Sequence, residues 1–307
     1  MLPYSDNNKR YYTLSSYNWR TYGRKMQKAA INAGLTCPNI DGTKGRGGCT
    51  FCSGGSGYFT SPGGTYITGQ LDSEIHRIRL KDSSCGIIAY FQSNSNTYAP
   101  VNVLRELYNT ALMDNRVDAL SVATRPDCLS RDIIELIRSV GTEKPLTVEL
   151  GLQTIHDSTA EKINRCHSYE EFLSGYSALK DAGIRVCVHI INGLPGETTE
   201  MMLTTAREIG KLCPDAVKIH LLHIICGTAL EKEYSAGRYV PMDISEYILT
   251  AVNQLRVLPP NTVIERLTGD GDKHTLIAPL WSRDKIRVLG SIDKLMALMD
   301  ARQGDSI

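Results

Sequence analysis

The chain reads Cys37-Pro38-Asn39-Ile40-Asp41-Gly42 and then Gly47-Gly48-Cys49-Thr50-Phe51-Cys52, within one glycine-rich loop that follows an apolar stretch. Four thiolates would complete a tetrahedral zinc site or hold every iron of a cubane cluster, whereas three thiolates leave one metal position for an exogenous ligand. The three cysteines of this loop therefore favour a metal site that carries out chemistry over one that only stabilises the fold.

Other uses of these cysteines fit the sequence less well. A structural zinc site would need a nearby histidine, and the nearest one is His76, with no second Cys-x-x-Cys in the chain. A redox Cys-x-x-Cys usually opens a helix, but glycines and serines follow Cys52. Disulfides are not indicated, because the nine cysteines are an odd number and the first residues form no hydrophobic signal core.

The composition is that of a folded protein in a reducing compartment. The 307 residues are 42% hydrophobic and 22% charged, which is enough to bury the core of a large α/β domain. No apolar run approaches the roughly 18 residues that a membrane span requires. We therefore expect a cytoplasmic protein that does not enter the membrane.

Residues 1–25 are expected to form a basic, aromatic extension. Arg20, Arg24 and Lys25 lie among tyrosines and Trp19, and Asp6 is the single acidic residue in this stretch. Cations contact phosphates and aromatic rings stack on unpaired bases, so the three basic residues are candidate RNA contacts. In the alternative interpretation the aromatic side chains pack on the domain and the charges are solvated.

Apolar runs rich in Val, Ile and Leu alternate with longer amphipathic segments over residues 26–237, which indicates a parallel sheet with helices outside it. We expect strands at Met26–Asn32, Cys85–Gln92, Val117–Ala123, Leu146–Gly151, Val186–Asn192 and Ala216–Leu222. The expected helices are Gln70–Arg79, Val101–Met113, Ser130–Ser139, Tyr169–Ala182 and Glu197–Leu212. These units predict an α/β fold, a partial parallel (β/α)6 TIM-like barrel.

Residues 238–307 are expected to form a C-terminal α/β closure of this barrel. A helix is expected at Asp243–Leu255, a short added strand at Val263–Leu267 and a terminal amphipathic helix at Ile286–Met299.

Each expected strand of the barrel ends in polar residues. The cysteine loop follows the first strand, Gln92 and Asn94 follow the second, and Thr124 follows the third. Glu149 and Gln153 come with the fourth strand, Asn192 ends the fifth, and His220 and His223 flank the end of the sixth. Because the carboxyl ends of parallel barrel strands meet at one face, these side chains should surround one site that faces the cysteines.

The cysteine loop and the β/α units together resemble the radical S-adenosylmethionine (radical SAM) superfamily. In that superfamily three cysteines hold a [4Fe-4S] cluster, and the fourth iron takes the amino and carboxylate groups of S-adenosylmethionine (SAM). Eleven residues separate Cys37 from Cys49, where the usual pattern is Cys-x3-Cys-x2-Cys. The catalytic subunit of elongator has a similarly expanded spacing.

Further motifs resemble the bacterial radical SAM family typified by the YtqA and YhcC proteins, over about residues 17–295. They are Cys37-Pro38-Asn39-x-Asp41-Gly42, Tyr90-Phe91-Gln92, Asn96-Thr97-Tyr98-Ala99-Pro100, Thr124-Arg125-Pro126-Asp127-Cys128-Leu129, Glu149-Leu150-Gly151-Leu152-Gln153-Thr154, Gly193-Leu194-Pro195-Gly196-Glu197-Thr198 and Leu267-Thr268-Gly269-Asp270-Gly271. Cys166 stands where the family generally has a glycine.

This resemblance implies a mechanism and a set of ligands. A reduced cluster held by Cys37, Cys49 and Cys52 would pass one electron to SAM and yield methionine and a 5′-deoxyadenosyl radical, which removes a hydrogen atom from the substrate. The residues that could bind SAM are Phe51 near the adenine, Glu149 at the methionine ammonium, Arg165 at the carboxylate, and Gln92, Asn94, Thr124, Gln153 and Asn192 at ribose or carboxylate.

Four of these assignments have structural alternatives. Phe51 could simply pack in the loop, Glu149 could form a structural ion pair, and Arg165 could cap a helix. Cys128 is a candidate catalytic thiol for the substrate or for hydrogen-atom donation, or else a small buried apolar group.

The resemblance also implies a substrate class. It associates the chain with tRNA modification, in particular with processing of the aminomethyl side chain of wobble uridine, and with a one-electron reductant such as flavodoxin or ferredoxin. Two alternatives stay open, namely radical chemistry on a small metabolite and a non-catalytic iron-sulfur binding or regulatory protein.

Overall fold

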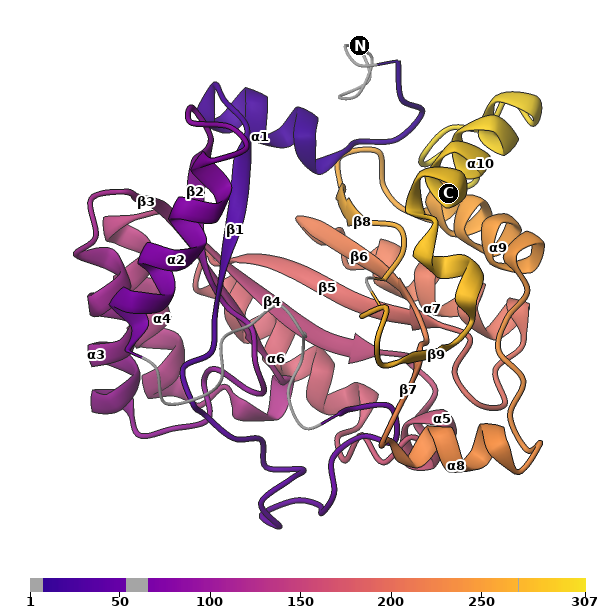
Figure 1. The fold of residues 1–307 in the computed structure, drawn as a ribbon, viewed down its shortest axis with the longest axis horizontal. Coiled ribbons are helices and arrows are strands. Elements are labelled where there is room, and N and C mark those ends of the chain that lie inside the picture. Colours follow the sequence, from indigo (N-terminus) through magenta and orange to yellow (C-terminus); the bar gives the residue numbers. More distant parts are fainter. Residues whose placement is uncertain (1–7, 54–65, 270) are drawn as a thin grey trace.

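A curled parallel sheet of seven strands forms the centre of the molecule in a computed structural model, which describes residues 8–53, 66–269 and 271–307 (Figure 1). The strand order is β1-β2-β3-β4-β5-β6-β8, and every neighbouring pair is parallel. The bounds are β1 Met26–Ile31, β2 Gly86–Phe91, β3 Val117–Thr124, β4 Leu146–Gln153, β5 Arg185–Asn192, β6 Ala216–Leu221 and β8 Val263–Arg266. The predicted partial barrel is confirmed.

The C-terminal segment adds to the sheet as predicted. β8 is the short strand that was expected near Val263, and it pairs with β6. A two-stranded antiparallel pair, β7 (Ile224–Ile225) with β9 (Leu276–Ala278), was not expected from the sequence. Both strands are too short for an alternating pattern to identify them.

Ten helices are present within the described residues, mostly on the outside of the sheet (Figure 1). They are α1 Leu14–Tyr22, α2 Ile67–Arg79, α3 Val101–Leu112, α4 Arg131–Glu143, α5 Asp157–Lys162, α6 Tyr169–Asp181, α7 Thr199–Lys211, α8 Ala229–Ser235, α9 Ile244–Val257 and α10 Lys285–Leu298. Among the helices so described, none has both the length and the apolar character needed to cross a membrane.

The sequence predicted the long helices and missed the short ones. The omitted helices α1, α5 and α8 have nine, six and seven residues, which is too little for a helical period to stand out. The start of α7 was predicted two residues early, because the Thr198 hydroxyl accepts a hydrogen bond from the backbone N–H of Met201 and makes Thr198 the N-cap.

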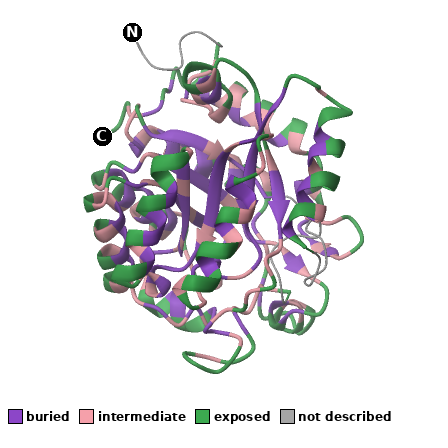
Figure 2. Ribbon diagram, turned by 90° about the vertical axis from the view of Figure 1, so that its left-hand side faces the viewer, coloured by how far each residue is buried: buried purple, intermediate pink, exposed green. Residues whose placement is uncertain are grey.

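One continuous core packs against the sheet (Figure 2). It contains Tyr11 from the N-terminal extension, Val148 from the barrel, and Tyr247 and Ile292 from the C-terminal segment. The predicted domain boundaries at residues 25 and 237 stay a prediction, which these shared contacts do not test.

The N-terminal extension packs across the amino end of the barrel. The carbonyl of Tyr12 accepts a hydrogen bond from the N–H of Ile264 in β8 (2.7 Å), and the Tyr17 ring lies 4.4 Å from the guanidinium carbon of Arg185. In Figure 1, α1 lies at the top, while the cysteine loop runs along the bottom. The alternative in which aromatic side chains pack on the domain therefore holds for Tyr12 and Tyr17.

The three basic residues of the extension have local contacts. Arg24 forms an ion pair with Asp118, Lys25 lies 3.6 Å from Asp82, and Arg20 lies over the ring of Tyr12. Their role in RNA binding stays a prediction, and they lie at the end of the barrel opposite the cysteines.

A layer of polar side chains fills the inside of the barrel, and each of the seven strands contributes to it. Its centre is Glu149 of β4, whose side chain is fully buried and forms ion pairs with Lys28 of β1 and Lys218 of β6. Its carboxylate also forms hydrogen bonds with three other side chains: Tyr90 of β2 (2.7 Å), Ser121 of β3 (2.7 Å) and His189 of β5 (2.8 Å). We call this set, with Glu265 of β8 and Arg185 of β5, the ionic layer.

The ionic layer connects the two edge strands of the open sheet. The Lys28 ammonium of β1 lies 3.0 Å from the carboxylate of Glu265 in β8, and Arg185 lies 3.2 Å from the same carboxylate. Burial alone would raise the pKa values of Glu149 and Glu265, but the two lysines hold the pKa of Glu149 well below its ordinary value and that of Glu265 at about 2. Both carboxylates are therefore ionised at neutral pH.

Replacement of Glu149 should destabilise the fold. Glu149→Gln keeps the size of the side chain but leaves two buried lysines facing one carboxylate, so we expect the free energy of unfolding to fall by about 3–5 kcal/mol. Urea-induced unfolding measures it. The matched control is Glu135→Gln on the exposed face of α4, where the Arg131 pair is solvated and stability should hardly change. Equal stability of the two variants would contradict the structural role of the ionic layer.

Candidate functional site

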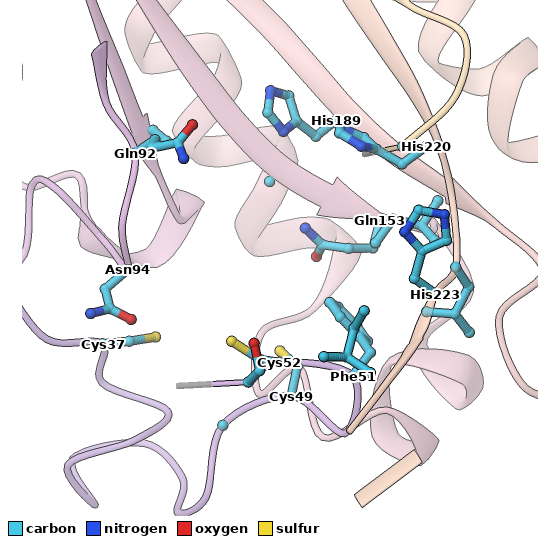
Figure 3. Close-up of a pocket in the computed structure, with 18 of the residues that line it drawn as sticks. Cys37, Cys49, Phe51, Cys52, Gln92, Asn94, Gln153, His189, His220 and His223 are labelled. Carbon is cyan, nitrogen blue, oxygen red and sulfur yellow. The ribbon is translucent and has the colours of Figure 1, made fainter. Parts of the chain in front are cut away.

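A cavity of about 750 Å³ opens at the carboxyl ends of the strands, above the ionic layer (Figure 3). Most residues predicted for the site line it: Cys37, Cys49, Phe51, Cys52, Gln92, Asn94, Thr124, Glu149, Gln153 and Arg165. Asn192 and Cys128 are not among the residues that line the cavity. The parallel barrel thus brings together side chains from the cysteine loop and from the strand ends.

The cysteine loop presents its three sulfur atoms to one region of the cavity (Figure 3). Each end of the loop forms a hydrogen-bonded turn. The backbone N–H of Ile40 donates to the carbonyl of Cys37 (2.8 Å), and the backbone N–H of Cys52 donates to the carbonyl of Cys49 (2.9 Å). The backbone of Thr50 joins the loop to the end of α5 and to the start of α8 through two further hydrogen bonds. These contacts fix the loop before any metal binds.

Asn39, the third residue of the Cys-Pro-Asn motif, holds the two halves of the loop together. Its side-chain amide is buried and donates to the carbonyl of Asn164 and, at 3.6 Å, to the sulfur of Cys49. Asn164 in turn donates to the carbonyl of Gly48 (2.8 Å). A Cβ at Gly45 would lie 2.1 Å from the Asn39 oxygen, so this close packing requires a glycine at position 45.

The three cysteines of the loop all line the cavity. Across residues 8–53, 66–269 and 271–307, no three His, Cys, Asp or Glu side chains are placed to hold one metal ion. A cubane makes no such demand, because each thiolate binds a different iron. Burial raises the pKa of Cys49 to about 12, although Arg125 opposes the rise, so an iron that bound this sulfur would have to displace its proton.

Two buried arginines lie beside the cysteine loop. Arg125 donates to the carbonyl of Arg165 (2.7 Å) and pairs with Asp127 (2.8 Å). Arg165 donates to the carbonyls of Leu152 (2.6 Å) and His167 (2.7 Å), and it thereby holds the loop after β4 in place. The predicted contact between Arg165 and the SAM carboxylate stays a prediction.

Gln153 reaches the cavity because β4 has an irregular end. The pairing of β4 with β5 shifts register between Gly151 and Gln153, and Gln153 has a left-handed backbone with φ of 67°. A Cβ at Gly151 would lie 2.8 Å from the Gln153 amide nitrogen, so Gly151 leaves room for this side chain. The Glu-x-Gly-x-Gln motif therefore shapes one wall of the cavity.

The residues after β2 and β3 make polar contacts at the opposite wall. Asn94 donates to the carbonyl of Leu35 (2.7 Å), so the loop after β2 supports the segment that leads to Cys37. The hydroxyl of Thr124 contacts that of Thr97, which also donates to the carbonyl of Cys128 (2.7 Å). Gln92 is largely buried at the end of β2.

Phe51 packs against a small apolar cluster that includes Leu222 and Ile224. Packing in the loop is thus one part of its role, and contact with adenine stays a prediction. Asn192 exchanges hydrogen bonds with Gln254 of α9 (2.8 Å each way) and is buried there, so its amide connects β5 to the C-terminal segment. Its predicted contact with SAM is not tested by this arrangement.

Of the two roles considered for Glu149, the structure shows the ion pair. Its carboxylate has partners on both oxygens, and binding of the methionine ammonium stays a prediction. The sequence held a signal that was missed, because Lys28 and Lys218 lie within largely buried strands, although it does not say which anion each lysine meets. A lysine inside a buried strand requires an anionic partner.

Cys128 and Cys166 lie outside the cysteine loop. Cys128 is buried, and burial raises the pKa of its thiol to about 12, so it carries its proton at neutral pH. Its catalytic role stays a prediction. Cys166 has φ of 60°, which is a left-handed conformation that glycine adopts freely and which accounts for the glycine that the family generally has there.

Comparison with known proteins identifies the family. A model of the radical SAM superfamily matches residues 40–209, and a model of the radical SAM C-terminal domain matches residues 214–297. The uncharacterized protein YtqA of Bacillus subtilis (strain 168) is 42% identical over 304 residues, which are 99% of this chain and 94% of YtqA.

The chain is also similar to two archaeal proteins. The tRNA uridine(34) acetyltransferase of Methanocaldococcus jannaschii is 34% identical over 161 residues, which cover 51% of this chain and 29% of that protein. The structure of Methanocaldococcus infernus Elp3 superimposes with a TM-score of 0.69 at 20% identity. It covers 91% of this chain and 64% of the Elp3 chain, less than two thirds, and so supports the fold alone.

The superfamily model covers more than half of the chain, and the similarity to YtqA extends over nearly all of it. Members of this superfamily use a [4Fe-4S] cluster and SAM, and the side chains of Cys37, Cys49 and Cys52 lie at the same cavity. The chain therefore belongs to the radical SAM superfamily.

Proposed function

We propose that this protein is a radical SAM enzyme that modifies tRNA, by processing the aminomethyl side chain of wobble uridine. The observation that carries the proposal is the convergence of three cysteine sulfurs on a cavity of about 750 Å³, which is within the size range of ligand sites. The tRNA substrate is supported by the relative that bears the name tRNA uridine(34) acetyltransferase, whose match covers half of this chain.

Cys37, Cys49 and Cys52 would hold the cluster, and the fourth iron would be left for SAM. When bound, the cluster supplies the electron that cleaves SAM to methionine and a 5′-deoxyadenosyl radical, which abstracts hydrogen from the substrate. Gln92, Asn94, Thr124 and Gln153 surround the adjacent space and can donate to or accept from the polar groups of SAM.

The side chains around the three cysteine thiols are held in place by hydrogen bonds and include two arginines. Asn39 donates to the sulfur of Cys49, and such bonds to cluster sulfurs tune the reduction potential. Arg125 and Arg165 are buried near the thiols, where their charges would offset the negative charge of a thiolate-bound cluster. Phe51 and its apolar neighbours Leu222 and Ile224 limit the access of water from one side.

An external donor must supply the electron, and we propose flavodoxin or ferredoxin. The tRNA would enter at the carboxyl end of the barrel. Arg20, Arg24 and Lys25 lie at the other end, so any contact that they make would be with a part of the tRNA remote from the modified base.

Loss of any one loop cysteine should abolish the cluster. Cys37→Ala, Cys49→Ala and Cys52→Ala each remove an iron ligand, so anaerobically reconstituted variants should lack the visible absorption and the EPR signal of a reduced [4Fe-4S] cluster. Cys213→Ala is the matched control, because this thiol is exposed, outside the loop and not part of the cavity lining. A normal cluster in all three loop variants would refute the ligand assignment.

A deletion strain should accumulate an incompletely processed wobble uridine. Mass spectrometry of nucleosides from its total tRNA is expected to show loss of the mature form and gain of a precursor. The mature form should return with the wild-type gene and with the Cys213→Ala gene, but not with Cys49→Ala. Unchanged tRNA nucleosides in the deletion strain would contradict the tRNA substrate and favour a small metabolite.

A further inference from the structure

Three histidines line the part of the cavity formed by β5, β6 and the segment after β6. His189 and His220 lie at the side of the cavity away from the three cysteines, and His223 lies beside Phe51 (Figure 3). Asn192 of β5 does not line the cavity, and the SAM-binding candidates that do line it come from other elements than β5 and β6. These imidazoles are therefore placed to meet a second molecule in the same cavity.

Two of the imidazoles have a buried nitrogen with no partner. Among the described residues, the Nε2 atoms of His220 and His223 are buried and make no hydrogen bond, whereas the Nε2 atom of His189 contacts Glu149 at 2.8 Å. A buried polar atom without a partner is unfavourable by about 1–3 kcal/mol. Such atoms in residues that line a cavity call for a partner, which a water molecule or a polar atom of a ligand can supply.

Both rings are held in place by their surroundings. The His220 ring lies 5.2 Å from the His189 ring, which Glu149 fixes in turn. The backbone at Gly269 lies close to the His223 ring, and a Cβ there would come within 2.8 Å of the ring carbon Cε1. This contact explains the first glycine of the Thr268-Gly269-Asp270-Gly271 motif, of which Asp270 lies outside the described residues.

The charges around the two rings select the kind of ligand. Burial lowers the pKa of His220 well below its ordinary value, and nearby His189, Arg266 and Lys218 lower it further, while Glu149 opposes this. Burial likewise lowers the pKa of His223 to about 4, together with Arg266 and Lys285. Both imidazoles are therefore neutral near pH 7, and the cations around them disfavour an ammonium group.

We propose that His220 and His223 form a substrate subsite, distinct from the SAM site, which binds hydrogen-bond-accepting oxygen atoms of the substrate. A neutral imidazole has one N–H to donate, and oxygen acceptors such as the carbonyl edge of a pyrimidine are also favoured by the positive surroundings. The inference rests on the proposed function in that it requires a substrate to enter this cavity, but it does not require that substrate to be tRNA.

The test compares SAM cleavage with and without substrate. Reconstituted, reduced protein is mixed with SAM alone, with SAM and bulk tRNA from the deletion strain, or with SAM and the small-molecule extract of the same strain. The release of 5′-deoxyadenosine is then measured. For His220→Leu and His223→Leu we expect the stimulation by the active fraction to fall about tenfold or more. Release with SAM alone, and its KM for SAM, should change by less than about twofold.

Two sets of variants keep the result interpretable. His220→Gln and His223→Gln retain a hydrogen-bonding group near the Nε2 position and should recover part of the stimulation, and cluster content confirms that each variant is folded. The matched control is His76→Leu, because His76 is exposed on α2. Stimulation like that of the wild type in the Leu variants would overturn the subsite, as would a raised KM for SAM with normal stimulation.

The two proposals fail in different ways. If the small-molecule extract stimulates wild-type cleavage and tRNA does not, the tRNA substrate is wrong, while loss of that stimulation in the Leu variants still supports the subsite. If tRNA stimulates all variants equally, the tRNA substrate holds and the subsite is wrong.

Discussion

The ion pairs of Glu149 with Lys28 and Lys218 hold together the interior of an open barrel. The sheet does not close by hydrogen bonds, because β1 and β8 are the edges of the strand order. Ion pairs connect the two edge strands in place of backbone hydrogen bonds. Lys28 of β1 contacts Glu149 of β4 and also Glu265 of β8. Such a layer tolerates little change, because removal of either carboxylate would leave a buried cation without its partner.

The same layer determines what the cavity above it can bind. Lys28, Lys218 and Arg185 face two carboxylates, so the layer has one formal positive charge in excess. The layer also orients His189, and His189 lies against His220. The cavity thus has the cysteine loop at one side and neutral imidazoles at another, and in our proposal SAM and substrate would bind next to each other there.

The barrel, the cysteine loop and most of the cavity lining could be predicted from the sequence. Apolar strands that alternate with amphipathic helices indicate a parallel sheet, and polar residues after each strand then lie at one end of it. It did not predict the partners of Glu149, since a carboxylate on a strand faces either a ligand or a neighbouring strand, and only the register decides. The same reasoning applies to Asn192, whose partner Gln254 lies 62 residues away. The packing of Tyr12 and Tyr17 on the barrel also depends on contacts that composition does not encode.

In the proposed enzyme, the three-cysteine site would leave one iron open for SAM, and the cavity beside it would be the site of radical formation. The most direct measurement is the anaerobic incubation of the reconstituted, dithionite-reduced protein with SAM, followed by chromatography of the products. We expect 5′-deoxyadenosine and methionine in equal amounts, and neither product without the reductant. A full [4Fe-4S] complement with no cleavage of SAM would contradict it.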